Sequence, residues 1–279
     1  MITVEDIILD QDKRGISDLR NLVPRDFCKR SSDLILENPG KILITTGFYI
    51  LTAGAAETDG PPGAIAIGNA LEKLGYEVVY ITDEYALDIM TECKSEKSRV
   101  IDFPIMDKTE SEEYALELLS VENPSILLSI ERCSAAQDDK YRNMRNLDIT
   151  GSTARIDLLF NKHKTTIGIG DGGNEIGMGN VLDGVDKSEK LVSYPAISTV
   201  NELIISSVSN WGGYGLLSSL SMSTGENVLP TVDEDMQIIR RMVDMGAVDG
   251  FSGEQTYKVD GFSLEENAHV LQRLHDILD

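Results

Sequence analysis

Residues 165–179 read TTIGIGDGGNEIGMG, an apolar run followed at once by a glycine-rich polar turn. The run 165–169 has the composition of a buried β-strand, and it stops at Asp171, Gly172 and Gly173. We expect Asn174 and Glu175 to open a helix, which predicts a strand, a sharp turn and a helix start. Ligands of open α/β sheets collect outside the carboxyl ends of the strands, where helix N-termini offer unpaired N–H groups. The stretch therefore predicts a site for an anionic ligand.

Two further stretches repeat this arrangement of an apolar β-run followed by a polar segment. The run 41–46 leads to ETDGPPG at 57–63, and the run 125–130 leads to a polar segment at 131–145. Because the carboxyl ends of parallel strands lie at one edge of a sheet, we expect these segments to converge on a single active site.

The rest of the chain alternates between β-runs and helical patterns, which is typical of a parallel sheet with right-handed crossovers. Residues 1–38 form a helical lead-in. Strands are expected at 41–46, 77–82, 125–130, 165–169 and 197–205, with a short one ending at 102–103, and helices at 63–74, 84–93, 111–121, 153–162, 214–223, 233–245 and 263–278. The prediction is one α/β domain over residues 1–279, with a mostly parallel, doubly wound sheet, helices on both faces and a helical N-terminal cap.

Composition restricts the function classes. The 279 residues carry 47 Asp and Glu against 25 Lys and Arg, a formal net charge of -22. Such a chain repels phosphate backbones and anionic lipids, so we expect no nucleic-acid and no membrane partner. Three well-separated cysteines without a CxxC motif argue against disulfides and structural zinc, and the absence of a signal-like start or a long apolar run predicts a cytoplasmic protein. The sequence leaves the oligomeric state open.

The glycine-rich turn has two other interpretations. Residues 168–173 match GxGxxG, but Asp171 would place a negative charge against a dinucleotide pyrophosphate, so we do not favour a dinucleotide site. Asp171, Asn174 and Glu175 could also serve only as turn and cap residues. That explanation accounts less well for a Gly-Gly pair and three polar groups at one strand end.

Four separated motifs carry a family resemblance. They are ETDGPPGA at 57–64, the stretch from ER at 131 through DDKYRNMRNLDIT to 150, GDGGNEIGMGNV at 170–181 and SNWGGYGL at 209–216. Together, and in this order, they resemble the D-glutamate cyclase family, from about residue 20 to the C-terminus. The resemblance implies conversion of D-glutamate to 5-oxo-D-proline with loss of water, which is a hydro-lyase activity.

This chemistry needs a base for the α-amine, neutralisation of the γ-carboxylate and an acid for the leaving oxygen. From the residues we assign Asp171 and Glu175 as acid and base. We expect the other groups to bind or orient the substrate: Arg132 and Arg145 as carboxylate clamps, Gly172 and Gly173 as N–H donors to the oxyanion, Asn174 and Asn210 for orientation, Thr58 and Asn143 as further contacts, and Asp59 and Asp138 as reserve carboxylates.

No cofactor is certain from the sequence. A Mg²⁺-type divalent cation is compatible with Asp59 and Asp138 as ligands, although no metal motif is present. Two alternatives to the cyclase remain open: a metal-dependent phosphate-handling hydrolase, and a non-catalytic module that binds an acidic metabolite or nucleotide at the same strand ends.

Overall fold

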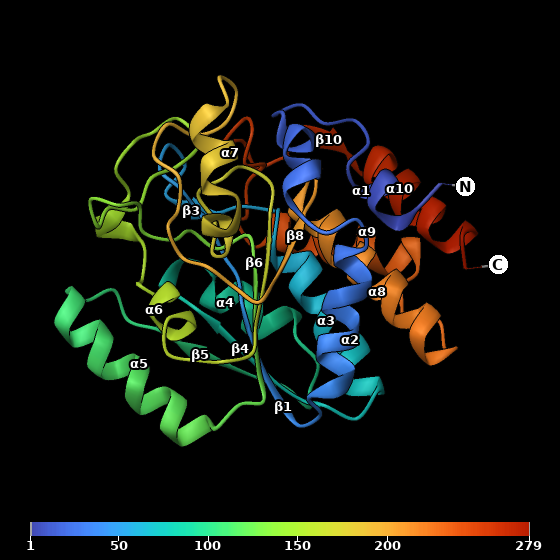
Figure 1. The fold of residues 1–279 in the computed structure, drawn as a ribbon, viewed down its shortest axis with the longest axis horizontal. Helices are drawn as coiled ribbons and strands as arrows, with labels where there is room; N and C mark the ends of the chain where they lie inside the picture. Colours follow the sequence, from blue (N-terminus) through green and yellow to red (C-terminus); the bar gives the residue numbers. More distant parts are fainter. Residues whose placement is uncertain (1, 279) are drawn as a thin grey trace.

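The centre of the protein is a sheet of six parallel strands, seen in a computed structural model that describes residues 2–278 (Figure 1). Its strands are β1 (Lys41–Thr45), β4 (Glu77–Thr82), β5 (Arg99–Asp102), β6 (Ile126–Ile130), β7 (Thr166–Gly170) and β8 (Glu202–Ile205). They lie in the order β5-β4-β1-β6-β7-β8. When the six strands of this sheet are numbered along the chain, their order is 3-2-1-4-5-6, which is a strand order found in doubly wound sheets. The predicted α/β fold is confirmed.

The strands form a sheet because both of their faces are apolar. In register, Ile42 of β1 lies opposite Val78 of β4 on one side and Ile126 of β6 on the other. Every residue of β6 and β7 is buried. Runs without a polar face are typical of a parallel sheet that helices cover on both sides.

Helices cover the two faces of the sheet. Ile42 and Ile44 belong to the core cluster formed with α2 (Phe27–Glu37), α3 (Pro61–Lys73) and α8 (Ser209–Thr224). Leu43, which points the other way, packs in a second cluster with α5 (Lys108–Glu122) and α6 (Asp157–Phe160). Helix α4 (Glu84–Cys93) contributes to the first cluster. This distribution confirms the doubly wound arrangement.

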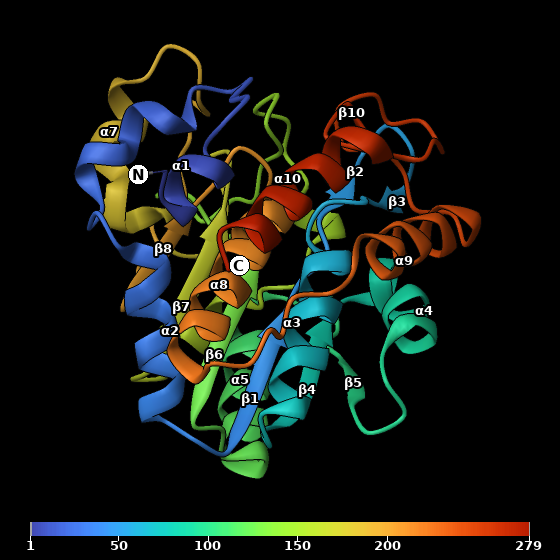
Figure 2. The same cartoon turned by 90° about the vertical axis from the view of Figure 1, so that its right-hand side faces the viewer.

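A further layer lies outside α8 and α3. It consists of α1 (Val4–Ile8), α9 (Val232–Asp244) and α10 (Leu264–Asp276). Figure 2 shows α10 in front of the sheet and α9 beside α4. Shorter elements lie beyond the strand ends: β2 (Tyr49–Ile50), β3 (Ala55–Ala56), β9 (Lys258–Val259), β10 (Phe262–Ser263), the 3-10 helices η1 (Ile16–Leu22), η2 (Thr150–Ser152) and η3 (Met178–Val181), and α7 (Leu182–Lys187).

Most of the expected elements occur within a few residues of their predicted bounds, but two expectations near the strand ends were wrong. No helix starts at Asn174, because Glu175 folds back onto the turn and the next regular element is η3. Helix α8 begins at Ser209 rather than near residue 214, so residues 209–213, between the expected strand and the expected helix, form the first turns of the helix. Strand β8 and helix α6 are also shorter than expected.

The N-terminal lead-in is helical as predicted, but it is more than a cap. Helix α2 packs against α8 and β8, on one face of the sheet. The segment between α1 and η1 carries Arg14 to the carboxyl ends of the strands, where it contacts Asp171.

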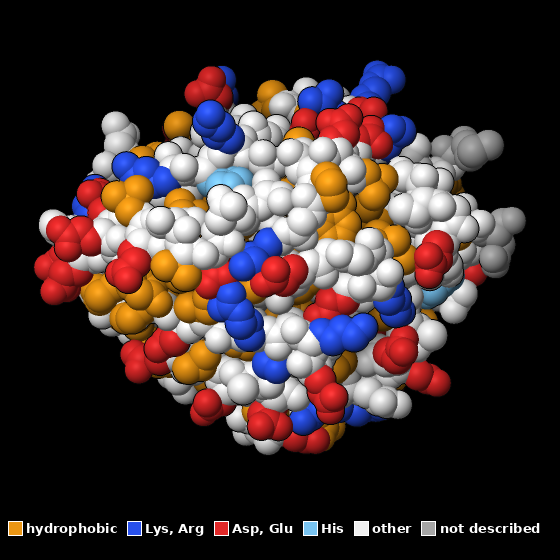
Figure 3. Space-filling model, turned by 90° about the horizontal axis from the view of Figure 1, so that it is seen from below, with side chains coloured by type: hydrophobic (Ala, Val, Ile, Leu, Met, Phe, Trp, Pro, Cys, Tyr) orange, Lys and Arg blue, Asp and Glu red, His pale blue; other side chains and the backbone are white. Residues whose placement is uncertain are grey.

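No helix in residues 2–278 is both long and apolar enough to cross a membrane. On the face seen from below, acidic and basic side chains are interspersed (Figure 3). Six of the 47 acidic residues are instead buried beyond the strand ends.

Candidate active site

Six buried carboxylates gather beyond the carboxyl ends of β1, β6 and β7. They are Glu57, Asp59, Glu131, Asp171, Glu175 and Asp260, which we call the acidic cluster. Oxygen atoms of Asp59, Asp171 and Asp260 lie within 4.8 Å of one another, and so do those of Glu131, Asp171 and Glu175. Strands β1 and β6 are neighbours at the point where the strand order reverses, which is where open α/β sheets bind ligands.

Arg14 lies among these carboxylates. Its Nη1 donates to Oδ1 of Asp171, and its Nη2 lies 2.7 Å from Oδ1 of Asp260. The surrounding carboxylates raise the pKa of Arg14 even though burial opposes its charge. The sequence-based prediction gave no role to Arg14, which belongs to no periodic pattern, or to Asp260, whose Asp-Gly pair is typical of a plain turn. It also gave none to Glu57 and Glu131, although both lie in the polar segments that it singled out.

Burial and mutual repulsion raise the pKa of several of these carboxyl groups. The pKa values of Glu57, Glu131 and Asp171 lie well above their usual range, mainly because the groups are buried. Burial raises the pKa of Asp59 to about 8, although N–H groups at the start of α8 oppose the shift. Groups of this kind can hold or release protons near neutral pH, as general acids and bases must.

Glu175 binds the turn from which it comes. Its carboxylate accepts hydrogen bonds from the N–H groups of Gly172 and Gly173, each at 2.7 Å. Gly173 has φ +102°, a conformation that glycine adopts readily. The N–H groups that we expected to hold an oxyanion are therefore already paired with an acidic side chain of the same loop.

Asp59 and Asn210 join the 57–63 loop to α8. Asp59 accepts hydrogen bonds from the backbone N–H groups of Ser209 and Asn210 at 2.8 and 2.7 Å. In return, the side-chain oxygen of Asn210 accepts from Gly60 and Gly63, and its amide nitrogen donates to the carbonyl of Thr58. Asn210 thus uses its polar atoms to hold the loop.

Arg132 is buried and its guanidinium binds protein groups. It donates to the carbonyl oxygen of Gly47 and to Oδ2 of Asp83, each at 2.5 Å, and to the carbonyl of Ala154 at 2.9 Å. These contacts tie the end of β6 to the segments after β1 and β4. Whether Arg132 also clamps a substrate remains a prediction.

A cavity of about 320 Å³ opens beside the acidic cluster. Its walls include Arg14, Glu57, Glu131, Asn143 and Arg145. Glu131 has φ +45°, a backbone conformation that is uncommon outside glycine and that recurs at functional sites. The structure therefore brings Asn143 and Arg145, from the expected residues, to one cavity with Arg14 and two carboxylic acids.

The remaining expected residues have other contacts. Asp138 pairs with Arg142 at the surface and lines a separate cavity that includes Tyr194. The Thr58 hydroxyl donates to the carbonyl of Lys258 at 2.7 Å. The Asn174 side chain donates to the carbonyl of Arg142, and its Oδ1 has no partner among the described residues.

The acidic cluster also fits a hard divalent cation. Carboxylate oxygens are the ligands that Mg²⁺ prefers. Oδ2 of Asp171 and Oδ2 of Asp260 accept no hydrogen bond from residues 2–278, whereas Oδ1 of Asp260 forms the ion pair with Arg14. Asp171 belongs to both groups of three acids whose oxygens lie within 4.8 Å, so it is the residue best placed for a metal ion.

Comparison with known proteins agrees with the motifs. The family model described as D-glutamate cyclase-like, C-terminal, matches residues 4–275. The human protein D-glutamate cyclase, mitochondrial, is 29% identical over an alignment of 312 residues, which covers 96% of this chain. The chain spans about half the length of that relative, 50% of which is aligned. The chain therefore belongs to the D-glutamate cyclase-like, C-terminal family.

Proposed function

We propose that this protein is a D-glutamate cyclase, an enzyme of the hydro-lyase type that converts D-glutamate to 5-oxo-D-proline and water. The observation that carries the proposal is a single cavity that combines two arginines, Arg14 and Arg145, with the buried acids Glu57 and Glu131. Family membership and the printed name of the human relative support the same reaction.

The two arginines suit the two carboxylates of the substrate. Arg14 is fixed by Asp171 and Asp260, so it presents its charge to the cavity from a defined position. Arg145 makes no ion pair with any carboxylate of residues 2–278. A planar guanidinium binds a carboxylate through two parallel hydrogen bonds. We assign Arg14 to the carboxylate that reacts, because the adjacent acids can exchange protons with it, and Arg145 to the other.

The reaction joins the α-amine nitrogen to the γ-carboxyl carbon and breaks one C–O bond of that carboxyl group. The ammonium group loses two protons in total, and the departing oxygen leaves as water. We assign Glu57 as the base, since no described residue donates a hydrogen bond to its side chain. Glu131 is assigned as the acid. Its Oε2 lies 2.6 Å from the Ser209 hydroxyl, which holds the side chain in place.

Asp171 takes a different part in this assignment from the acid or base expected from sequence. It is fully buried, it does not line the cavity and it pairs with Arg14. We therefore assign it as a positioning residue for Arg14. Glu175 holds the turn at Gly172 and Gly173 and so keeps Asp171 in place.

The direct test is to incubate the purified protein with D-glutamate and with L-glutamate and to measure 5-oxoproline. We expect 5-oxo-D-proline from the D-isomer and a loss of at least about 100-fold in turnover for Glu57→Gln, which keeps the size of the side chain but cannot take a proton. Saturable binding of D-glutamate without product would favour the non-catalytic module.

A metal-dependent phosphate-handling hydrolase remains a second candidate, because Oδ2 of Asp171 and Oδ2 of Asp260 have no partner among the described residues and could hold a divalent cation. Hydrolysis of a phosphate ester by Mg²⁺-loaded protein, with no cyclisation of either glutamate isomer, would favour this alternative.

A further inference from the structure

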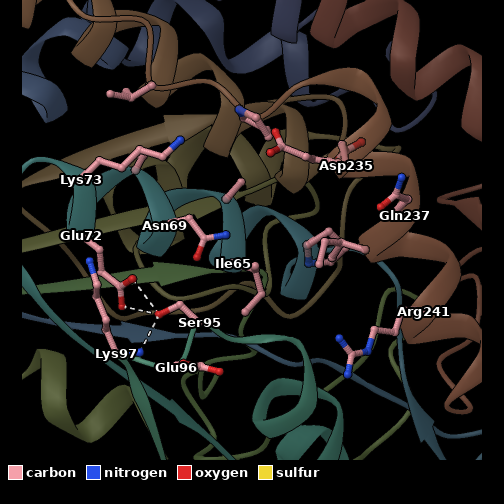
Figure 4. Close-up of a pocket in the computed structure, with 17 residues that line it drawn as sticks. Ile65, Asn69, Glu72, Lys73, Ser95, Glu96, Lys97, Asp235, Gln237 and Arg241 are labelled. Atoms are coloured by element: carbon pink, nitrogen blue, oxygen red, sulfur yellow. Dashed lines mark hydrogen bonds between the residues drawn. The ribbon is translucent and has the colours of Figure 1, made fainter.

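A second and larger cavity lies away from the acidic cluster, between α3, the loop after α4 and α9. Its volume is about 590 Å³, within the range of small-molecule sites. Figure 4 shows its walls, with Ile65 near the middle and Asp235 on the opposite side from Ser95 and Lys97. We call this cavity the α3–α9 pocket. The reaction proposed above makes no use of it.

Asp235 is the unusual residue of this pocket. Its side chain is only 3% exposed, and its Oδ1 accepts a hydrogen bond from the hydroxyl of Tyr214. Oδ2 is buried and has no hydrogen-bond partner among the described residues. A buried carboxylate oxygen without a donor is costly, so it favours a ligand that brings one.

Of the other acids that line the pocket, Glu72 and Glu234 are already engaged and Glu96 is exposed to solvent. Both carboxylate oxygens of Glu72 accept from the Ser95 hydroxyl, and Glu234 closes the capping box of α9 with Thr231. Two cations, Lys73 and Lys97, line the pocket and pair with no carboxylate of residues 2–278 within 4.0 Å.

Apolar side chains complete the walls between these charges. Ile65 and Ala66 of α3 lie on one side, and Ile238 of α9 lies on the other. An apolar wall with a few charged groups is the usual construction of a small-molecule site. Asp235 on one side and Lys73 and Lys97 on the other suit a ligand with an ammonium group at one end and a carboxylate at the other.

We propose that the α3–α9 pocket binds a small zwitterionic molecule, the size of an amino acid or a dipeptide, with its ammonium group on Asp235 and its carboxylate on Lys73 or Lys97. The body of the ligand packs against Ile65 and Ile238. This ligand need not be the substrate, and the proposal does not depend on the reaction at the acidic cluster.

The pocket shares two segments with the acidic cluster. Tyr214, the partner of Asp235, belongs to α8, whose first N–H groups bind Asp59. Pro62 lines the pocket and follows Asp59 by three residues. A ligand in the pocket therefore contacts the elements that hold one side of the candidate active site.

Isothermal titration with three probes of equal chain length tests the proposal. The probes are 6-aminohexanoate, hexylamine and hexanoate. We expect saturable 1:1 binding of 6-aminohexanoate, and affinities at least about tenfold lower for the two probes that lack one charge, because each loses a charge-assisted contact. Equal affinity for hexylamine, or no saturable binding of 6-aminohexanoate, would overturn the proposal.

Three variants locate the binding. Asp235→Asn removes the charge at nearly constant size, and Asn69→Trp places a bulky group over the pocket from an exposed position of α3. Both should weaken 6-aminohexanoate at least about tenfold. Because Asn69 is exposed, its variant tests the proposal even if Asp235→Asn does not fold. Glu57→Gln, in the acidic cluster, should leave this affinity unchanged. Binding lost in Glu57→Gln and kept in Asn69→Trp would place the ligand in the other cavity.

Discussion

Arg14 and Asp171 form an ion pair across 157 residues of sequence, at the carboxyl end of β7. Asp171 is fully buried, while the side chain of Arg14 is 18% exposed and lines the cavity of the candidate active site. The pair gives the acidic cluster a fixed cation, without which six buried carboxylates would have only one another and polar hydrogen-bond donors as neighbours.

Kinetics of Asp171→Asn can show whether Asp171 positions Arg14 or transfers a proton. In Asp171→Asn, Arg14 loses one of its two ionic partners and keeps Asp260, so we expect KM for D-glutamate to rise about tenfold while kcat falls less than about fivefold. Asp33→Asn, which removes an acid from the surface of α2, is the matched control. A fall in kcat of about 100-fold at unchanged KM would instead make Asp171 a proton-transfer residue.

Arg132→Lys distinguishes a structural arginine from a substrate clamp. Lysine cannot reproduce the three hydrogen bonds to Gly47, Asp83 and Ala154, so the free energy of unfolding should fall by about 2–4 kcal/mol. KM should stay within about threefold of the parent. Urea unfolding and steady-state kinetics measure the two effects.

The control for Arg132→Lys is Arg30→Lys. Arg30 makes a bidentate pair with Glu202 at the surface, and its loss should cost less than about 1 kcal/mol. Unchanged stability of Arg132→Lys together with a large rise in KM would support the carboxylate clamp expected from the sequence.

Gly250 sets the position of the Glu57 carboxylate. A Cβ at residue 250 would lie 1.9 Å from Oε2 of Glu57, so Gly250→Ala must displace that side chain. If Glu57 is the base, kcat should fall at least about tenfold. Stability should change little, because the displaced group is the end of a flexible side chain. Gly151→Ala is the control, since nothing lies within 4 Å of its added Cβ. Equal kcat in the two variants would exclude Glu57 as the base.

Asp235 makes stability depend on pH in a predictable direction. Burial raises its pKa from 3.8 to about 6, although the hydrogen bond from Tyr214 opposes the shift. The folded state therefore binds this proton more tightly than the unfolded state. The contribution to stability is fully present below pH 3.8 and is lost as the pH rises through about 6.

Asp235→Asn removes this dependence. Each pKa unit corresponds to about 1.4 kcal/mol. The free energy of unfolding of the variant minus that of the parent should therefore rise by about 3 kcal/mol from pH 4 to pH 8. Urea unfolding of both proteins at the two pH values measures the difference. A constant difference between variant and parent would show that Asp235 does not titrate in this range.

A divalent cation at the acidic cluster should stabilise the folded protein, because the unfolded chain cannot assemble the ligands. We expect 10 mM Mg²⁺, at constant ionic strength, to raise Tm by about 2–4 °C after chelator treatment. The rise should vanish in Asp171→Asn, because Asp171 is common to both groups of candidate ligands. An equal rise in Asp171→Asn would place any bound cation elsewhere.

Local patterns were enough to predict the sheet and most of the helices. Strands were predictable at 77–82 and 125–130 because a strand that is buried on both faces needs a continuous apolar run. The end of α3 was predictable because its last turn is followed by a residue with positive φ, which favours glycine, here Gly75. The sequence also placed the candidate site at the strand ends, since the polar segments directly follow the β-runs. Asn143 and Arg145, from the polar segment after β6, line the cavity, and their contacts with a substrate stay a prediction.

The pairing of side chains was decided only by tertiary structure. Nothing local distinguishes Arg132, which binds Asp83, from Arg14, which reaches the cavity, because each partner lies far away in sequence. Glu175 could have faced a ligand, but its carboxylate is close enough to bind the N–H groups of its own turn. The sequence by itself determined the sheet and the edge at which polar groups collect. Which of these groups face the cavity was settled by long-range packing, because hydrogen-bond partners for buried charges come from distant segments.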